Sequence, residues 1–62
     1  MITLNLGEPE AEVLETLLRR ELSDLKMEIH HTDRWEYREE LLLKQSRLME
    51  CLKQLEKARV HS

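Results

Sequence analysis

Residues 11–29 have the sequence AEVLETLLRRELSDLKMEI, and this stretch decides the fold. Its apolar side chains recur at spacings of three and four, at Ala11, Leu14, Leu18, Leu22, Leu25 and Ile29. At 100° per residue these positions fall within about 80° of arc, which defines one apolar face of an α-helix. Glu8-Pro9-Glu10 comes just before, with proline and acidic residues where a first helical turn favours them. The pattern predicts a helix over residues 8–31.

A second apolar face follows a short link, at Tyr37, Leu41, Leu48, Leu52 and Leu55. Asp33 and Glu36 have the spacing of a capping box, so we expect Asp33 to cap a helix over residues 33–59. The link 30–33 contains neither glycine nor proline, which leaves one continuous helix as an alternative. In a continuous helix the two apolar faces would point about 110° apart and split the core. The sequence therefore predicts an all-α helical hairpin over residues 8–60.

The two predicted helices differ in the sign of their charge. Residues 8–28 carry seven acidic and three basic side chains, a net charge of −4. Residues 41–62 carry five basic and two acidic side chains, a net charge of +3. An antiparallel hairpin places the acidic start of the first helix beside the basic end of the second, which also suits both helix dipoles. One surface ion pair contributes only about 0.5 kcal/mol, but several together favour this orientation.

Residues 2–6, Ile-Thr-Leu-Asn-Leu, alternate apolar and polar side chains before Gly7. This period of two is typical of a half-buried strand. We expect residues 1–7 to form a short, extended, strand-like arm. Ile2, Leu4 and Leu6 would share one face of it.

Composition narrows the class of protein. The chain has 62 residues, of which 37% are charged, 13 are leucine and one is glycine. That balance is typical of long helices and argues against sandwiches, barrels and disulfide scaffolds. The longest apolar run, Leu41-Leu42-Leu43, is too short to cross a membrane, and we expect no signal peptide. The single cysteine, Cys51, fits a reducing cytoplasm, so we expect a cytoplasmic protein.

Each predicted helix also carries a second, narrower apolar stripe. A lone hairpin buries one stripe per helix, and two helices alone rarely offset the entropy of ordering a chain of this size. The second stripes therefore predict another neighbour, most simply a second copy in a homodimeric four-helix bundle, with an unknown protein partner as the other possibility. The predicted interface residues are Ile2, Leu4, Leu6, Val13, Leu17, Trp35, Leu42 and Met49.

Few residues suggest a catalytic or metal-binding role. Glu28 and His31 have the spacing used in di-iron carboxylate bundles, but they lie at a helix flank and a helix end, which favours a solvated terminus. His30, His31 and Asp33 fix no tetrahedral zinc site. Cys51 has no general base placed near it and lies beside the apolar face. That position predicts a buried, inert thiol, with a disulfide between protomers as the minor alternative. We expect no catalytic residue, no metal site and no cofactor, and hence a non-enzymatic protein.

A strand followed by two helices also suggests a ribbon-helix-helix DNA-binding protein, the alternative function. Thr3 and Asn5 would then enter the major groove. The first basic residue is Arg19, however, and glutamates follow the arm, so the arm would repel phosphates. The leading hypothesis is a helical protein that self-associates as an interaction or scaffolding module, with nucleic acid disfavoured as a partner.

The middle third of the chain resembles small uncharacterised bacterial proteins of similar length that form helical hairpins. The resemblance rests on Leu22, Leu25, Glu28, Ile29, Thr32, Asp33, Arg38, Glu39 and Leu41. It implies a bacterial, cytoplasmic protein, and it brings no known activity and no functional residues.

Overall fold

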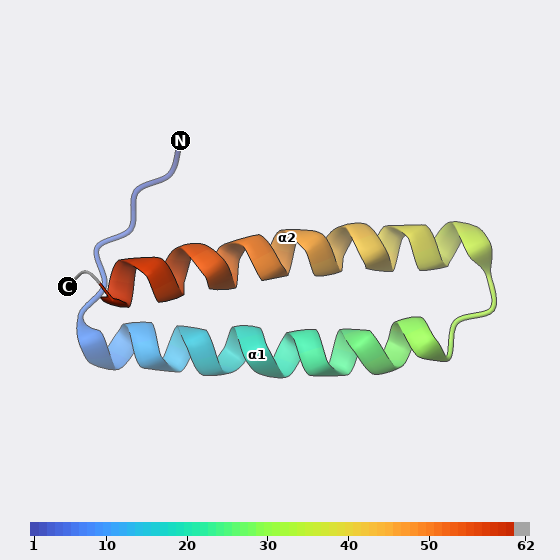
Figure 1. Ribbon diagram of the computed structural model, residues 1–62, viewed down its shortest axis with the longest axis horizontal. Helices are drawn as coiled ribbons and strands as arrows, with labels where there is room; N and C mark the ends of the chain where they lie inside the picture. Colours follow the sequence, from blue (N-terminus) through green and yellow to red (C-terminus); the bar gives the residue numbers. More distant parts are fainter. Residues whose placement is uncertain (61–62) are drawn as a thin grey trace.

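The computed structural model describes residues 1–60 and contains two antiparallel helices, α1 (Glu8–His30) and α2 (Trp35–Val60). Figure 1 shows the helices side by side along their whole length, joined by residues 31–34. The hairpin is elongated, with extents of 42 × 23 × 14 Å. The all-α hairpin predicted from the sequence is confirmed. Within the described residues no helix has both the length and the apolar character needed to cross a membrane.

Helix α1 begins without a side-chain cap and ends with both a backbone and a side-chain hydrogen bond. The Gly7 carbonyl accepts a hydrogen bond from the Ala11 N–H at 3.0 Å, and Pro9 stands in the first turn, where its missing N–H removes no helical bond. At the other end the His31 N–H donates to the Met27 carbonyl at 3.1 Å. The Thr32 hydroxyl donates to the Glu28 carbonyl, which satisfies one of the free carbonyls of the last turn.

Helix α2 begins later than the sequence predicts. The first helical hydrogen bond runs from the Arg38 N–H to the Arg34 carbonyl at 2.9 Å, so Arg34 stands at the N-cap. The expectation that Asp33 caps this helix is therefore wrong. A capping residue must directly precede the first helical residue, and Asp33 lies one position too early for a helix that starts at Trp35.

The core lies between the helices along the predicted apolar faces. Leu25, Ile29 and Leu41 are 1%, 8% and 6% exposed, and Leu48 packs against them. On α1 all six residues of the predicted face are buried or half-buried. On α2 the face is continued by half-buried leucines and, near the helix end, by Arg59, whereas Tyr37 stays exposed.

Cys51 is exposed, and the prediction of a buried thiol is wrong. Cys51 lies roughly 80° from the middle of the inward face of α2. That face consists of the buried and half-buried residues Leu41, Gln45, Leu48, Leu52, Leu55 and Arg59. A residue at this angle is covered only if a third element packs beside it. The single hairpin has no such element among its described residues.

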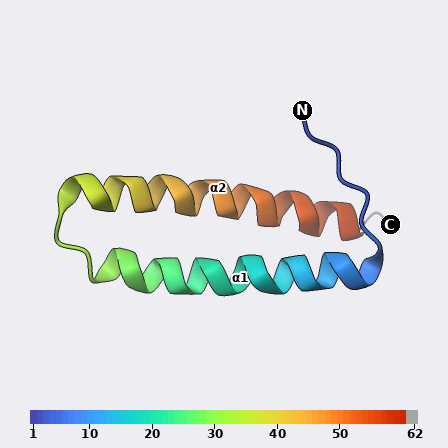
Figure 2. The ribbon, with the colours of Figure 1, turned by 180° about the vertical axis from the view of Figure 1, so that it is seen from behind.

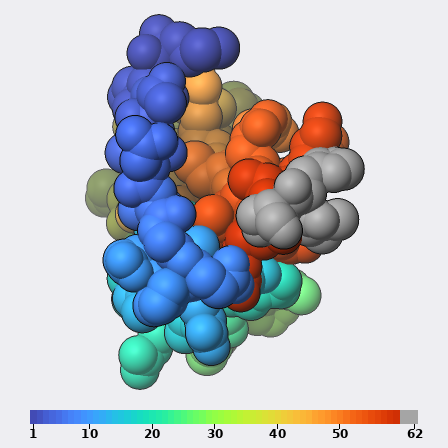
Figure 3. Space-filling view, turned by 90° about the vertical axis from the view of Figure 1, so that its left-hand side faces the viewer, coloured from blue at the N-terminus to red at the C-terminus, as the bar shows by residue number. Residues whose placement is uncertain are grey.

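Residues 1–7 form no strand in the single chain. They leave the start of α1 at the open end of the hairpin and extend past the end of α2 (Figures 1 and 2). In the end-on view of Figure 3 this dark-blue arm runs along one side of the molecule. The arm therefore has no paired edge within the chain, and a paired strand would need a second molecule.

Candidate protein–protein interface

The open end of the hairpin is held by ion pairs between α1 and α2. The guanidinium of Arg59 contacts the carboxylates of Glu8 and Glu15, with Nε 3.1 Å from Glu8 Oε1. Arg19 joins Glu15 at 3.0 Å and Glu56 at 3.2 Å, which extends the network across both helices. The hydrogen bond to Glu8, opposed by partial desolvation, raises the pKa of Arg59. The acidic start of α1 and the basic end of α2 thus lie together, as the charge pattern predicts.

The turn end has a smaller polar contact on one flank. The Tyr37 hydroxyl donates to Glu28 Oε1 at 2.8 Å, and this bond, followed by the charge of Glu28, raises the pKa of the phenol. Lys44 and Glu21 form an ion pair at 3.4 Å. The Glu28 carboxylate is engaged by a tyrosine. Within residues 1–60, no three His, Cys, Asp or Glu side chains gather where they could hold a metal ion.

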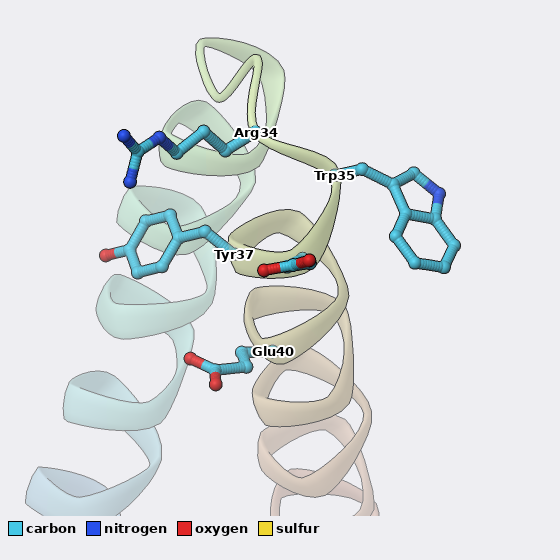
Figure 4. Close-up of a pocket in the computed structure, with 5 residues that line it drawn as sticks. Arg34, Trp35, Tyr37 and Glu40 are labelled. Atoms are coloured by element: carbon cyan, nitrogen blue, oxygen red, sulfur yellow. The ribbon is translucent and has the colours of Figure 1, made fainter.

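The predicted interface residue Trp35 points into solvent. Figure 4 shows its indole directed away from Arg34 and Tyr37, which stand on the other side of the helix start. Its exposed fraction is 70%, so it does not cover the turn between the helices. Leu42 and Met49 continue this edge at intervals of seven residues, 44% and 57% exposed. We call Trp35, Leu42 and Met49 the α2 edge.

The other predicted interface residues are exposed as well. On α1, Val13 and Leu17 are 59% and 54% exposed. In the arm, exposure falls from 87% at Ile2 to 44% at Leu6. Met27 is 62% exposed on α1, and the sequence analysis missed it because polar residues separate it from Leu17. A spacing of fourteen residues from Val13, close to four helical turns, is the signal that places Met27 on the same side of α1 as Val13.

The exposed α1 residues, Val13 and Leu17, lie on the opposite flank of the hairpin from the α2 edge. Glu56 is seven residues from Met49 and shares the α2 edge, and Arg19 reaches Glu56 from α1. Arg19 therefore marks the same flank. Leu17 is two residues from Arg19, about 200° around α1, and so faces the other way. One flat partner surface cannot cover both the α2 edge and the exposed α1 residues Val13 and Leu17.

Neither family models, nor curated proteins, nor solved structures give a match to this chain. The resemblance to bacterial hairpin proteins stays a prediction. The exposed apolar surfaces are the features that bear on function.

Proposed function

We propose that this chain is a non-enzymatic helical protein that self-associates and serves as an interaction or scaffolding module. The observation that carries the proposal is the exposure of apolar side chains on three separate surfaces: the arm, the outer side of α1 and the α2 edge. Scattered single apolar residues on a surface need no explanation, but aligned sets on helix faces are typical of binding surfaces.

The small core supports the proposal. Only Ala11, Leu25, Ile29 and Leu41 are buried among the residues whose exposure is described. A chain of about 60 residues buries a smaller fraction of its surface on folding than a larger domain does, and is marginally stable alone. Association with a second copy would add buried apolar area and give an assembly of four helices. Surfaces that self-association leaves open would be available to an unknown protein partner.

A cytoplasmic location and a bacterial source remain part of the proposal. They rest on the single cysteine and on the resemblance of the middle third of the chain. The ribbon-helix-helix alternative requires the arm to pair as a strand across a dimer, and an arm followed directly by Glu8 and Glu10 lacks the charge for phosphate contacts.

Sedimentation equilibrium tests the proposal directly. We expect a mass above the 7.5 kDa of one chain at micromolar concentration, and a melting temperature that rises with protein concentration. A folded monomer whose melting temperature is the same from about 1 to about 100 μM would contradict self-association.

A further inference from the structure

We infer that a second copy of the chain docks antiparallel on the outer side of α1, through a seam with two reciprocal Arg20–Asp24 ion pairs. The inference rests on the proposed self-association and names its surface, its orientation and its register. The residues of this outer seam are Val13, Leu17, Arg20, Asp24, Met27 and His31.

The outer seam has the spacing of a coiled coil. Its residues follow one another at intervals of four, three, four, three and four, the 3.5-residue repeat of a heptad seam. Successive positions alternate between the two core sites of the heptad. The seam is centred about 150° from the buried face of α1, so it points away from α2. Every seam residue is exposed in the single chain.

An antiparallel copy matches this seam residue by residue. With the two-fold axis on the outer side of α1 at the level of residue 22, Leu17 faces Met27 of the second copy, and Val13 faces its His31. Arg20 then faces Asp24 of the second copy, and the two-fold repeats each pair. All three pairs join the two different core sites of the heptad, as interdigitating layers of an antiparallel helix pair require.

Charge selects this arrangement over others. Arg20 and Asp24 form no ion pair or side-chain hydrogen bond within the described residues, so both are available to a second molecule. A parallel alignment would place Arg20 against Arg20. A slip of one heptad would set Arg20 against Leu17 and leave the charge without a counterion. Polar residues within an apolar seam are known to fix orientation and register in this way.

The flanks of the seam bring one like-charge contact, which each chain offsets. A two-fold axis perpendicular to the helices sets each flank of α1 against the same flank of the second copy, so Glu21 lies beside Glu21 of the second copy and Glu28 lies beside its Leu14. Each Glu21 is already paired with Lys44 of its own chain at 3.4 Å, and Glu28 accepts a hydrogen bond from Tyr37. The charge of Lys44 offsets the repulsion between the two Glu21 carboxylates, so the flanks permit close approach of two α1 helices.

The α2 edge lacks such self-complementarity. Arg38 and Gln45 lie between its apolar residues at heptad spacing. The acidic residue at this spacing, Glu56, already pairs with Arg19 of α1. An antiparallel copy would set Arg38 against Met49. The inferred assembly therefore has the two α1 helices in the middle and the α2 edges on the outside, free for another protein.

Charge reversal tests the seam without disturbing the core, because both side chains are exposed. Arg20→Asp and Asp24→Arg should each raise the dissociation constant of the dimer at least about ten-fold, since each creates two like-charge contacts. The double variant, with the charges exchanged, should restore the wild-type value within about three-fold. Arg47→Asp is the matched control, exposed on α2 away from the seam, and should leave association unchanged.

Disulfide trapping tests the register in a Cys51→Ser background. A mixture of Leu17→Cys and Met27→Cys chains should form a mixed disulfide on oxidation, because these positions face each other. Leu17→Cys alone should not, because two copies of position 17 are ten residues apart along the seam, about 15 Å.

The outcomes separate the seam from the proposed function. A stable dimer whose dissociation constant is unchanged by either single charge reversal, and which gives no mixed disulfide, would overturn the seam and leave self-association intact. A wild-type chain that is monomeric at every concentration would overturn both.

Discussion

Replacing Leu25 by alanine is expected to remove the centre of the hairpin core. Leu25 is 1% exposed and is the largest side chain that is fully buried. It packs with Ile29 of its own helix and Leu41 of α2, so the Leu25 methine and its two methyl groups would be lost between the helices. Substitutions of buried leucine by alanine destabilise proteins by about 2–5 kcal/mol, depending on how far the cavity collapses.

The expected loss here lies in the lower half of that range. Only two helices surround Leu25, so they can close on the cavity more easily than the walls of a multilayer core. We expect the free energy of unfolding to fall by about 2–3 kcal/mol. For a domain of this size the melting temperature should then fall by about 10–20 °C.

Urea denaturation followed by far-UV circular dichroism measures the effect. Wild type and variant must be compared at one protein concentration, because association contributes to the apparent stability. Leu43→Ala is the control, since Leu43 is 59% exposed on α2 and lies in none of the proposed contacts. We expect it to cost less than about 0.5 kcal/mol. Equal, small losses for both variants would refute the packing described for the core.

Three further predictions follow from exposed groups. The phenol of Tyr37 should titrate above pH 10.0, because its bond to Glu28 raises its pKa, so the stability from this bond is present below pH 10 and is lost as the pH rises further. Ultraviolet titration with Glu28→Gln should return the midpoint toward 10, and identical curves would contradict the bond. Deleting residues 1–6 should raise the dissociation constant of the dimer or lower the melting temperature, because Ile2, Leu4 and Leu6 are exposed in the single chain and would be buried only in an assembly. Unchanged sedimentation and melting would show that the arm does not contribute to the assembly. Trp35 emission should stay water-like as the dimer forms, and a blue shift with concentration would place the contact on the α2 edge instead.

The apolar spacing was sufficient to predict the hairpin and its buried faces. On α1 the run from Ala11 to Ile29 keeps intervals of three and four without a polar interruption. This apolar face is therefore defined by the sequence of α1 alone, whatever element packs against it. The start of α2 was less predictable. Asp33 is a better cap by residue type than Arg34, yet the turn geometry starts the helix at Trp35. The chain path between two packed helices, rather than capping preference, fixes that boundary.

The wrong prediction of a buried Cys51 has a similar cause. The width of a buried face depends on how many elements pack against the helix, and the sequence of one helix does not determine how many do. A residue 80° from the centre of the face is covered in a bundle and exposed in a hairpin. The same reasoning applies to the α2 edge, whose burial depends on a neighbour outside the chain.

The outer seam shows how a charged interruption can carry information about a partner. Arg20 and Asp24 break the apolar stripe of α1, so a search for apolar periodicity stops at Leu17 and misses Met27. The two charges, however, are placed symmetrically about Leu22, and so are Leu17 and Met27. Their arrangement favours one orientation and one register of a second copy, which a purely apolar stripe would not do. A stripe of leucines alone would allow several sliding alignments, whereas this seam allows the alignment in which both charges find counterions.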